Sequence, residues 1–403
     1  MLLAIAWKNI WRNKTRSAII IAAISLGLLG GLLASGVSFG MGDQMIAEAK
    51  GTHLSDIQIH QKNFRESQNI ADTIPQASTL VSRIGAMHNV KGVAQRVVLT
   101  AMAASPVTAT GVELIGVVPE REKQITDLPK KIIDGSYFGG KVRNPVVIGQ
   151  ALARELDVKT GSKMVFTFQN DSGVITGSAF RVAGIFKTVS SDFDKTTAFV
   201  RAEDLQRLIG SGSWHEIAIL LAPKTSADSV AAFLRKTSSG LQVDTWKQLS
   251  PDLAYVSESL ATMLYIFMIV ILAALAFGIV NTMLMVVLER RRELGMLMAV
   301  GMSQKTIFGM IVLETVVLSL TGALIGMVMT IIVMAILSRT GIDLLVISQG
   351  LSQFGIPQIL YPSLPAGMYP ILMAMVIATA ILAAIYPAVK ALKLKPSEAL
   401  RTI

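Results

Sequence analysis

The chain has 403 residues, of which 52% are hydrophobic and only 16% charged, and its mean hydropathy is +0.56. This composition excludes a disordered chain and is too apolar for an ordinary soluble enzyme. The absence of cysteine excludes disulfide scaffolds, cysteine nucleophiles and zinc ribbons, while a formal net charge of +10 leaves nucleic acid or a membrane surface as the basic residues' partner.

The N-terminal region predicts a surface helix followed by a membrane span. In residues 1–16, apolar side chains recur at helical spacing from Leu3 to Trp11, which is typical of an amphipathic helix in the headgroup layer. Residues 17–42 follow as an apolar run that is longer than the 7–15 residues of a signal-peptide core, so we expect an uncleaved anchor. Two small-residue pairs predict close packing of this span against the second span or a dimer mate. They are Gly27, Gly31, Gly36 and Gly40.

Residues 43–256 predict a mixed α/β domain inserted after the first span. Eight short β-rich segments alternate with Gly, Pro, Asn and Asp, from DIQIH (56–60) to EIAILL (216–221). Helical patterns lie at 76–88, 149–156, 202–209 and 225–237. We expect two lobes, in which roughly residues 116–222 are inserted into a lobe made from the flanking segments.

The inserted domain contains one deceptive motif and no catalytic pattern. Gly135 to Lys141 satisfies the spacing of a phosphate-binding loop, but Val142 stands where Ser or Thr should hold magnesium, and a strand pattern follows instead of a helix. The four histidines show no metal-binding spacing, and no serine lies in a G-x-S-x-G motif. We therefore expect no catalytic site, no metal and no cofactor in this chain.

The C-terminal part predicts three more spans, at 257–288, 310–338 and 369–390, separated by a loop at 339–368 and followed by a tail at 391–403. Basic residues gather before the first span, between the second and third, and after the fourth. The positive-inside rule then places both termini and the 289–309 segment in the cytoplasm. Because the charge lies at membrane boundaries, nucleic acid is not the expected partner.

The segment 289–309 predicts a docking helix on the membrane surface. It mixes a charged cluster with the apolar run LGMLMAVG, a combination that the positive-inside rule alone would not produce. The residues expected to meet a soluble partner are Arg290, Arg291, Arg292 and Glu293 as a rim, Leu294, Met296 and Leu297 as an apolar knob, and Glu289, Gly295, Gly301 and Met302 as their frame.

These segments closely resemble a known family. ERRRELGMLMAVGMS (289–303) is similar to the coupling-helix signature of FtsX-like permeases of the MacB/Lol type, the mechanotransmission ABC transporters. YPAVKALKLKPSEALR (386–401) resembles the closing motif of that family, and GSYF with NPVVIGQALAREL (135–156) resembles the MacB-type periplasmic core. The resemblance covers nearly the whole chain.

The resemblance implies a bacterial inner-membrane permease that works as a homo- or heterodimer. A separate ATPase subunit would bind ATP and magnesium and dock on the coupling helix, and a lipoprotein carrier or an adaptor would meet the periplasmic domain. The layout is most similar to lipoprotein-releasing permeases. The alternatives are a MacB-like tripartite efflux permease and an FtsX-like transducer that activates a periplasmic partner. We expect an acyl-chain groove at the outer ends of spans one and two, lined by Met41, Met45, Met263 and Phe267.

Overall fold

A computed structural model describes residues 14–139, 142–170, 172–210, 212–238, 240–344 and 357–392. The chain divides into two compact units, which we call the helical bundle and the inserted domain. The bundle is built from the residues up to Gly42, Glu258–Ile342 and the residues from Leu360. The inserted domain contains Asp43–Ser257 with Asp343–Ile359.

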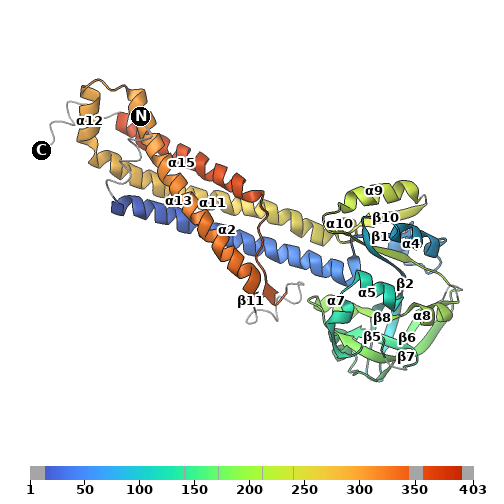
Figure 1. The fold of residues 1–403 in the computed structure, drawn as a ribbon. Coiled ribbons are helices and arrows are strands. Elements are labelled where there is room, and N and C mark those ends of the chain that lie inside the picture. Colours follow the sequence, from blue (N-terminus) through green and yellow to red (C-terminus); the bar gives the residue numbers. More distant parts are fainter. Residues whose placement is uncertain are drawn as a thin grey trace. The chain divides into compact units, whose positions relative to one another are not determined.

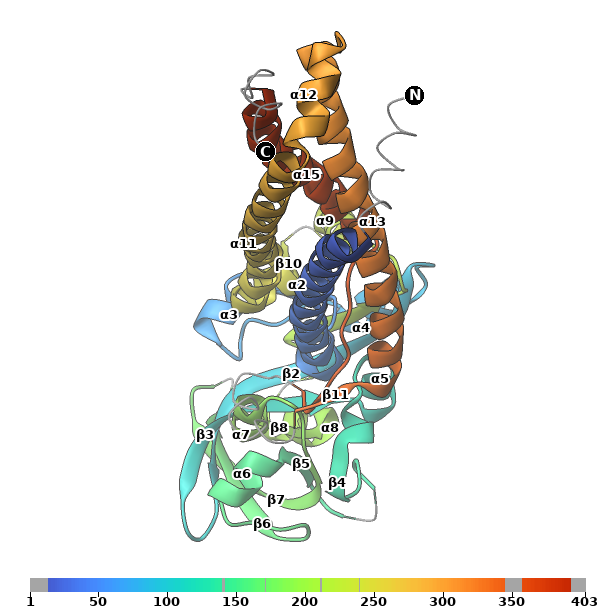
Figure 2. The ribbon, with the colours of Figure 1, turned by 90° about the vertical axis from the view of Figure 1, so that its left-hand side faces the viewer.

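Four long helices form the bundle and run alongside one another (Figures 1 and 2). They are α2 (Lys14–Ala49), α11 (Pro251–Glu289), α13 (Gln304–Thr340) and α15 (Met368–Leu392). Each is long and apolar enough to cross a membrane, so the predicted arrangement of one span followed by three is confirmed. At about 1.5 Å per residue, all but α15 are much longer than the roughly 30 Å of a bilayer core, so these helices extend beyond it.

Apolar side chains from all four helices share the centre of the bundle. Leu28 and Leu32 of α2 belong to one buried cluster with Leu272 of α11, Ala323 of α13 and Val376 of α15. The surrounding faces expose large apolar side chains, which a lipid environment accepts. Two short strands, β11 (Ile342–Asp343) and β12 (Ile359–Leu360), lie in the segment predicted as the 339–368 loop.

The inserted domain is a ten-stranded mixed sheet with helices packed on it (Figure 1). The order along the sheet is β10-β1-β9-β2-β3-β8-β5-β7-β4, and β6 pairs with β2 and β7. The strands are β1 (Ile57–Gln61), β2 (Val90–Ala104), β3 (Ala109–Val117), β4 (Ile132–Gly135), β5 (Pro145–Gly149), β6 (Lys163–Gln169), β7 (Ile175–Phe186), β8 (Thr197–Arg201), β9 (Glu216–Leu221) and β10 (Leu241–Thr245).

The helices of the inserted domain are short. They are α3 (Phe64–Ser67), α4 (Ala77–Gly85), α5 (Pro119–Ile125), α6 (Gln150–Glu155), α7 (Ser191–Thr196), α8 (Ala202–Ile209), α9 (Ala227–Thr237) and α10 (Trp246–Leu249), with the 3-10 turn η2 (Leu128–Lys131). The four predicted helices are confirmed as α4, α6, α8 and α9, and the eight β-rich segments all fall on strands. The mixed α/β character of the domain is therefore as predicted.

The predicted bounds of the inserted lobe are wrong at two strands, because β3 lies almost wholly before residue 116 and yet shares the core of β5, β6, β7 and β8. β9 (Glu216–Leu221) was assigned to the inserted lobe, but it pairs with β1 on one side and β2 on the other. Its Ile217 and Ile219 lie in a core with β1, α4 and α9, whereas β3, β5, β6, β7 and β8 contribute to a separate core. Strand β2 contributes to both cores, so the lobes share one continuous sheet.

Two predicted segments lie largely outside the described residues. The amphipathic helix at 1–16 is described only from Lys14, where α2 begins, and the tail at 391–403 only as far as Leu392. Helix α2 also continues past the predicted end of the first span at Gly42, and it runs into a π-helical turn, η1 (Lys50–Leu54). Residues 14–54 are thus helical throughout.

Candidate docking helix and the charge cluster of the inserted domain

A short helix, α12 (Arg291–Ala299), lies between α11 and α13 at one end of the bundle, inside the predicted docking segment (Figure 1). Helix α11 ends at Glu289, and Arg290 leaves the helical conformation before α12 starts. Gly301 then takes a φ of +100°, a conformation that favours glycine, and allows the sharp turn. Ser303 caps α13 by accepting a hydrogen bond from the backbone N–H of Thr306 at 3.3 Å.

The inward face of α12 holds it against the bundle. Leu294 is only 3% exposed and belongs to the same buried cluster as Val287 of α11 and Ile307 and Ile311 of α13. Burial of a leucine of this kind is worth about 1.5–3 kcal/mol. The expectation that Leu294 forms part of the partner-facing knob is therefore wrong, because the side chain is buried in its own chain. Gly295 is also buried.

The outward face of α12 is an exposed stripe of four residues at positions i, i+4, i+7 and i+8, which lie on one side of a helix. We call it the α12 stripe; it consists of Arg292, Met296, Ala299 and Val300. Met296 is 56% exposed and Val300 83%. The remaining predicted residues lie beside it: Arg291, Glu293, Leu297 and Met302 are half-buried, and Glu289 and Gly301 are exposed.

Arg290 connects α12 to α13 through two carboxylates. Its Nη1 atom lies 3.3 and 3.2 Å from the two carboxylate oxygens of Glu314 on α13, and its Nε donates to Glu293 of α12 at 2.9 Å. The Arg290 side chain is 15% exposed and that of Glu314 7%, whereas Glu293 is 45% exposed. The predicted rim residue Arg290 therefore faces the bundle.

The four predicted packing glycines of α2 meet two different neighbours. A Cβ added at Gly27 would lie 3.2 Å from Leu275, and one at Gly31 would lie 2.8 Å from Ile271 and Met268, all on α11, the second span. A Cβ at Gly36 or Gly40 would instead collide with Met334 of α13 or with the chain segment at 361–363. The backbone N–H of Ser363 donates to the carbonyl of Gly36 at 2.9 Å. Gly36 and Gly40 are predicted to face the second span or a dimer mate, whereas in this chain they face α13 and residues 361–363.

The residues predicted to line an acyl-chain groove are only partly accessible. Met263 and Phe267 are 56% and 61% exposed and lie one turn apart on α11. Met41 and Met45 are half-buried and lie one turn apart on α2. A groove formed by these four residues stays a prediction.

A buried charge cluster lies in the inserted domain, centred on Arg96 of β2. The Arg96 guanidinium donates to both oxygens of Glu122 on α5, at 3.1 and 2.7 Å, and to Glu216 on β9 at 2.7 Å. It also donates to the carbonyl of His53, in η1, at 2.8 Å. Burial works against the charge of Arg96, but the two carboxylates outweigh it and hold its pKa above the usual value. Burial would likewise raise the pKa of Glu216, yet Arg96 and His60 lower it to about 2.

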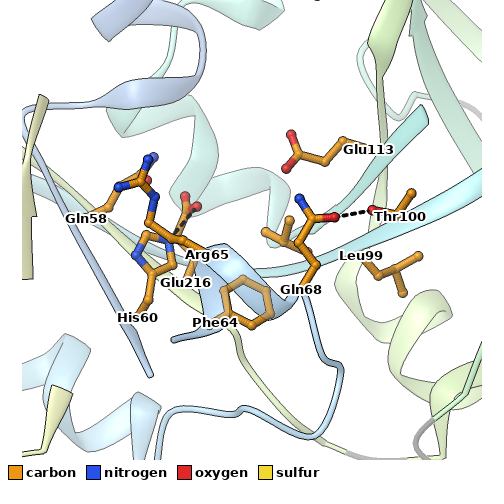
Figure 3. Close-up of a pocket in the computed structure, with 10 residues that line it drawn as sticks. Gln58, His60, Phe64, Arg65, Gln68, Leu99, Thr100, Glu113 and Glu216 are labelled. Carbon is orange, nitrogen blue, oxygen red and sulfur yellow. Dashed lines mark hydrogen bonds and ion pairs between the residues drawn. The ribbon is translucent and has the colours of Figure 1, made fainter. Parts of the chain in front are cut away.

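A small cavity of about 230 Å³ lies beside this cluster (Figure 3). Glu216, His60 and Phe64 line it together with Glu113, which projects from β3. Burial, followed by repulsion from Glu216, raises the pKa of Glu113 to about 7, and Arg96 and His60 only partly offset this. The side chain of Glu113 has exposed surface, but the surrounding protein and the nearby charge of Glu216 shift its carboxyl group toward the protonated form.

The charge cluster was missed at the sequence level, although Arg96 interrupts the apolar strand AQRVVLTA. Such a residue is rarely buried without a partner, but nothing in the sequence indicates that the partners lie 26 and 120 residues away. Among the described residues, no group of three or more His, Cys, Asp or Glu could hold a metal ion. The histidines His60 and His215 each stack on the ring of Phe64.

Four apolar helices in a one-plus-three order, an α/β domain inserted after the first, and a short helix between the second and third define a multi-pass membrane permease. Two family models match the chain. The MacB-like periplasmic core domain matches residues 17–237, and the FtsX-like permease C-terminal domain matches residues 265–396. The chain therefore belongs to the FtsX/MacB-type family of ABC transporter permeases.

Curated relatives agree with this family and differ in activity. The lipoprotein-releasing system transmembrane protein LolC of Xylella fastidiosa (strain Temecula1) is 24% identical over 71% of this chain and 72% of its own length. An uncharacterized ABC transporter permease of Methanocaldococcus jannaschii is 24% identical over 82% of this chain and 83% of its own. The pyoverdine export ATP-binding/permease protein PvdT of Pseudomonas fluorescens (strain Pf-5) is 23% identical over 82% of this chain but only 51% of its own.

One solved structure of the same family type covers the inserted domain. The periplasmic region of MacB from Actinobacillus actinomycetemcomitans aligns with 52% of this chain and 97% of its own, at 11% identity and a TM-score of 0.37. The family assignment above rests on the sequence models and not on this alignment.

Proposed function

We propose that this chain is the permease subunit of a mechanotransmission ABC transporter, and that a separate ATPase subunit docks on the α12 stripe. In this proposal α12 faces the cytoplasm, the ATPase holds ATP and magnesium, and two permeases work as a dimer. The observation that carries the docking proposal is the division of α12 into a buried face, which fixes the helix, and an exposed stripe with Met296 at its middle and Val300 at its end. An exposed apolar stripe with a basic residue at one end is the chemistry of an interface core with a charged rim.

Docking can be tested with Met296→Glu. A charge placed at the middle of a desolvated interface should weaken ATPase binding by about 2 kcal/mol, or roughly 30-fold in Kd. The measurement is titration of labelled ATPase onto the purified permease in nanodiscs. Ile175→Glu is the matched control, because Ile175 is 76% exposed and lies in the inserted domain. Equal binding by the two variants would refute docking on the stripe.

The substrate we propose is a membrane lipoprotein, extracted and handed to a periplasmic carrier. The support is that LolC and LolE relatives are matched over most of their own length, 72% and 81% in two of them. A MacB-like export permease is the second candidate, because the export protein PvdT matches 82% of this chain. The layout of the domains is common to both.

The two candidates differ in what leaves the membrane. The permease and its ATPase are reconstituted in liposomes that contain an acylated lipoprotein and, as a control, the same protein anchored by a transmembrane helix. Lipoprotein release predicts ATP-dependent transfer of the acylated form alone to a soluble carrier. Retention of both forms, with ATP-dependent movement of a small solute, would move the assignment to export.

A further inference from the structure

We infer that Arg290 and Glu314 are a positioning pair: their buried ion pair locks the docking helix α12 to α13, so that force applied to α12 enters α13. This inference rests on the proposed function, since it assigns the route by which docking would act on the membrane helices. Arg290 here touches neither ATP nor substrate. Its role is to set the place and stiffness of α12.

The location of the pair is what makes it a lock. Arg290 lies in the break between α11 and α12, the point at which the chain could otherwise hinge. Its guanidinium reaches Glu314, ten residues inside α13, at 3.2 Å. Since α12 is joined to α13 on its other side by the Gly301 turn, the ion pair closes a loop of chain at its base. The helix α12 is flanked by two breaks in helical conformation, at Arg290 and at Gly301. Because the chain is tied to α13 at both of these breaks, α12 is less free to swing as a hinge.

The two carboxylates that meet Arg290 differ in burial, and this difference separates the lock from an ordinary surface contact. Glu314 is 7% exposed, so its charge depends on a protein partner, whereas Glu293 is 45% exposed and can be solvated by water. Removal of one partner from a buried pair leaves an uncompensated charge, while an exposed pair contributes little. The Arg290–Glu314 contact therefore adds to the packing of Leu294 in holding α12 in place, and the Arg290–Glu293 contact contributes less.

α13 is suited to receive the force because it also packs closely against α2. Gly322 and Gly326 of α13 let the two backbones approach, since a Cβ at Gly326 would lie 2.8 Å from the carbonyl oxygen of Ser25. The hydroxyl of Ser25 donates to the carbonyl of Gly322 at 2.8 Å. A helix that carries α12 at one end and α2 along its side connects the docking surface to the helix that leads into the inserted domain.

The experiment compares Glu314→Gln with the matched control Glu293→Gln in the full-length permease bound to its ATPase. The chain has no cysteine, so one cysteine introduced at Met298 of α12, outside the α12 stripe, and one at Leu324 of α13 can carry the two spin labels. We expect Glu314→Gln to widen the label-to-label distance distribution at least twofold. We also expect a fivefold or greater fall in the hydrolysis rate that the permease adds to its ATPase, with the KM for ATP and the amount of bound ATPase unchanged. Glu293→Gln should match the wild type in all four.

A charge swap guards against simple misfolding. Arg290→Glu and Glu314→Arg should each lose the added hydrolysis rate, and the double variant should recover it to within about twofold of the wild type. Wild-type label width and rate in Glu314→Gln, or no recovery in the double variant, would overturn the positioning pair. Failure of the wild-type permease to bind any ATPase would instead overturn the proposed function, and the label width would still decide whether the pair fixes α12.

Discussion

Replacement of Arg96 by methionine should strongly destabilise the inserted domain, because it removes the guanidinium that pairs with two buried carboxylates. Arg96 is 1% exposed, and its partners Glu122 and Glu216 have side chains that are 0% and 10% exposed. Loss of one member of a buried ion pair typically costs about 3–5 kcal/mol. The same contact, together with His60, lowers the pKa of Glu216 to about 2, which agrees in direction with a native state that favours its ionised form. For a domain of 150–250 residues, such a loss lowers Tm by roughly 10 °C.

The assay is thermal unfolding of the full-length permease in detergent, followed by tryptophan fluorescence. Two of the four tryptophans, Trp214 and Trp246, lie in the inserted domain, and Trp214 packs against its two larger cores. In a background with Trp7→Phe and Trp11→Phe, the signal reports this domain alone. The matched control is Arg65→Met, since Arg65 is 36% exposed, pairs with Asp244 at 3.5 Å and makes its other hydrogen bonds, to the carbonyls of Gln248 and Leu249, at the surface. It should shift Tm by no more than a few degrees.

A triple variant separates loss of charge balance from loss of packing. Arg96→Met combined with Glu122→Gln and Glu216→Gln removes the uncompensated charges and should recover much of the lost stability, because a buried ionic group can be replaced as a whole at little cost. A Tm for Arg96→Met within 2 °C of the Arg65→Met control would refute the reasoning. So would a triple variant that melts no higher than the single variant at pH 7.

Three further predictions follow from contacts in the two units. Glu113→Gln should stabilise the inserted domain above pH 7 and not below pH 4.5. The pKa of Glu113 is raised to about 7 in the folded state, so the wild type loses stability as the pH rises from 4.5 to 7. Urea unfolding of both proteins at pH 5 and pH 8 measures this difference in stability. Gly40→Leu should destabilise the bundle by about 1–3 kcal/mol, because its Cβ would lie 2.8 Å from the Cα of Pro362. The control is Gly30→Leu on the same helix, where a Cβ meets nothing within 4 Å. Heating followed by size-exclusion chromatography compares the two variants, and equal Tm values would contradict the prediction. Gly326→Leu should destabilise the bundle by a similar amount through its clash with Ser25, and Gly309→Leu on the same helix is the control. An unchanged Tm in the same assay would show that α13 does not pack closely against α2 at this position.

The spans and most strands could be predicted because their signals are local. An apolar run of 20 or more residues needs no partner to be recognised, and alternating β-rich segments bounded by turn residues fell on strands. The lobe boundary was wrong because strand pairing is not local: EIAILL reads as a strand but does not indicate that it pairs with DIQIH, about 160 residues earlier. Similarly, α2 continues past Gly42 because the polar residues that follow still permit a helix.

The orientation of α12 could not be predicted because both of its faces carry apolar residues. Leu294 and Met296 are two positions apart, so they lie on different sides of the helix, and hydropathy alone does not tell which side packs on the bundle. The neighbouring helices decide this: Ile307 and Ile311 of α13 complete a buried cluster with Leu294. Arg290 was likewise predicted to be a rim residue, because the carboxylate that draws it inward belongs to a different helix.

Within the helical bundle, two contacts link α12 to α2 by way of α13. Arg290 ties α12 to α13, and Ser25 ties α13 to α2. Helix α2 then runs without interruption into η1, where the carbonyl of His53 accepts a hydrogen bond from Arg96. Glu314→Gln removes the contact between Arg290 and α13, and Gly326→Leu forces α13 away from Ser25, so we expect the two substitutions to loosen the connection between α12 and α2 at two different points of the bundle.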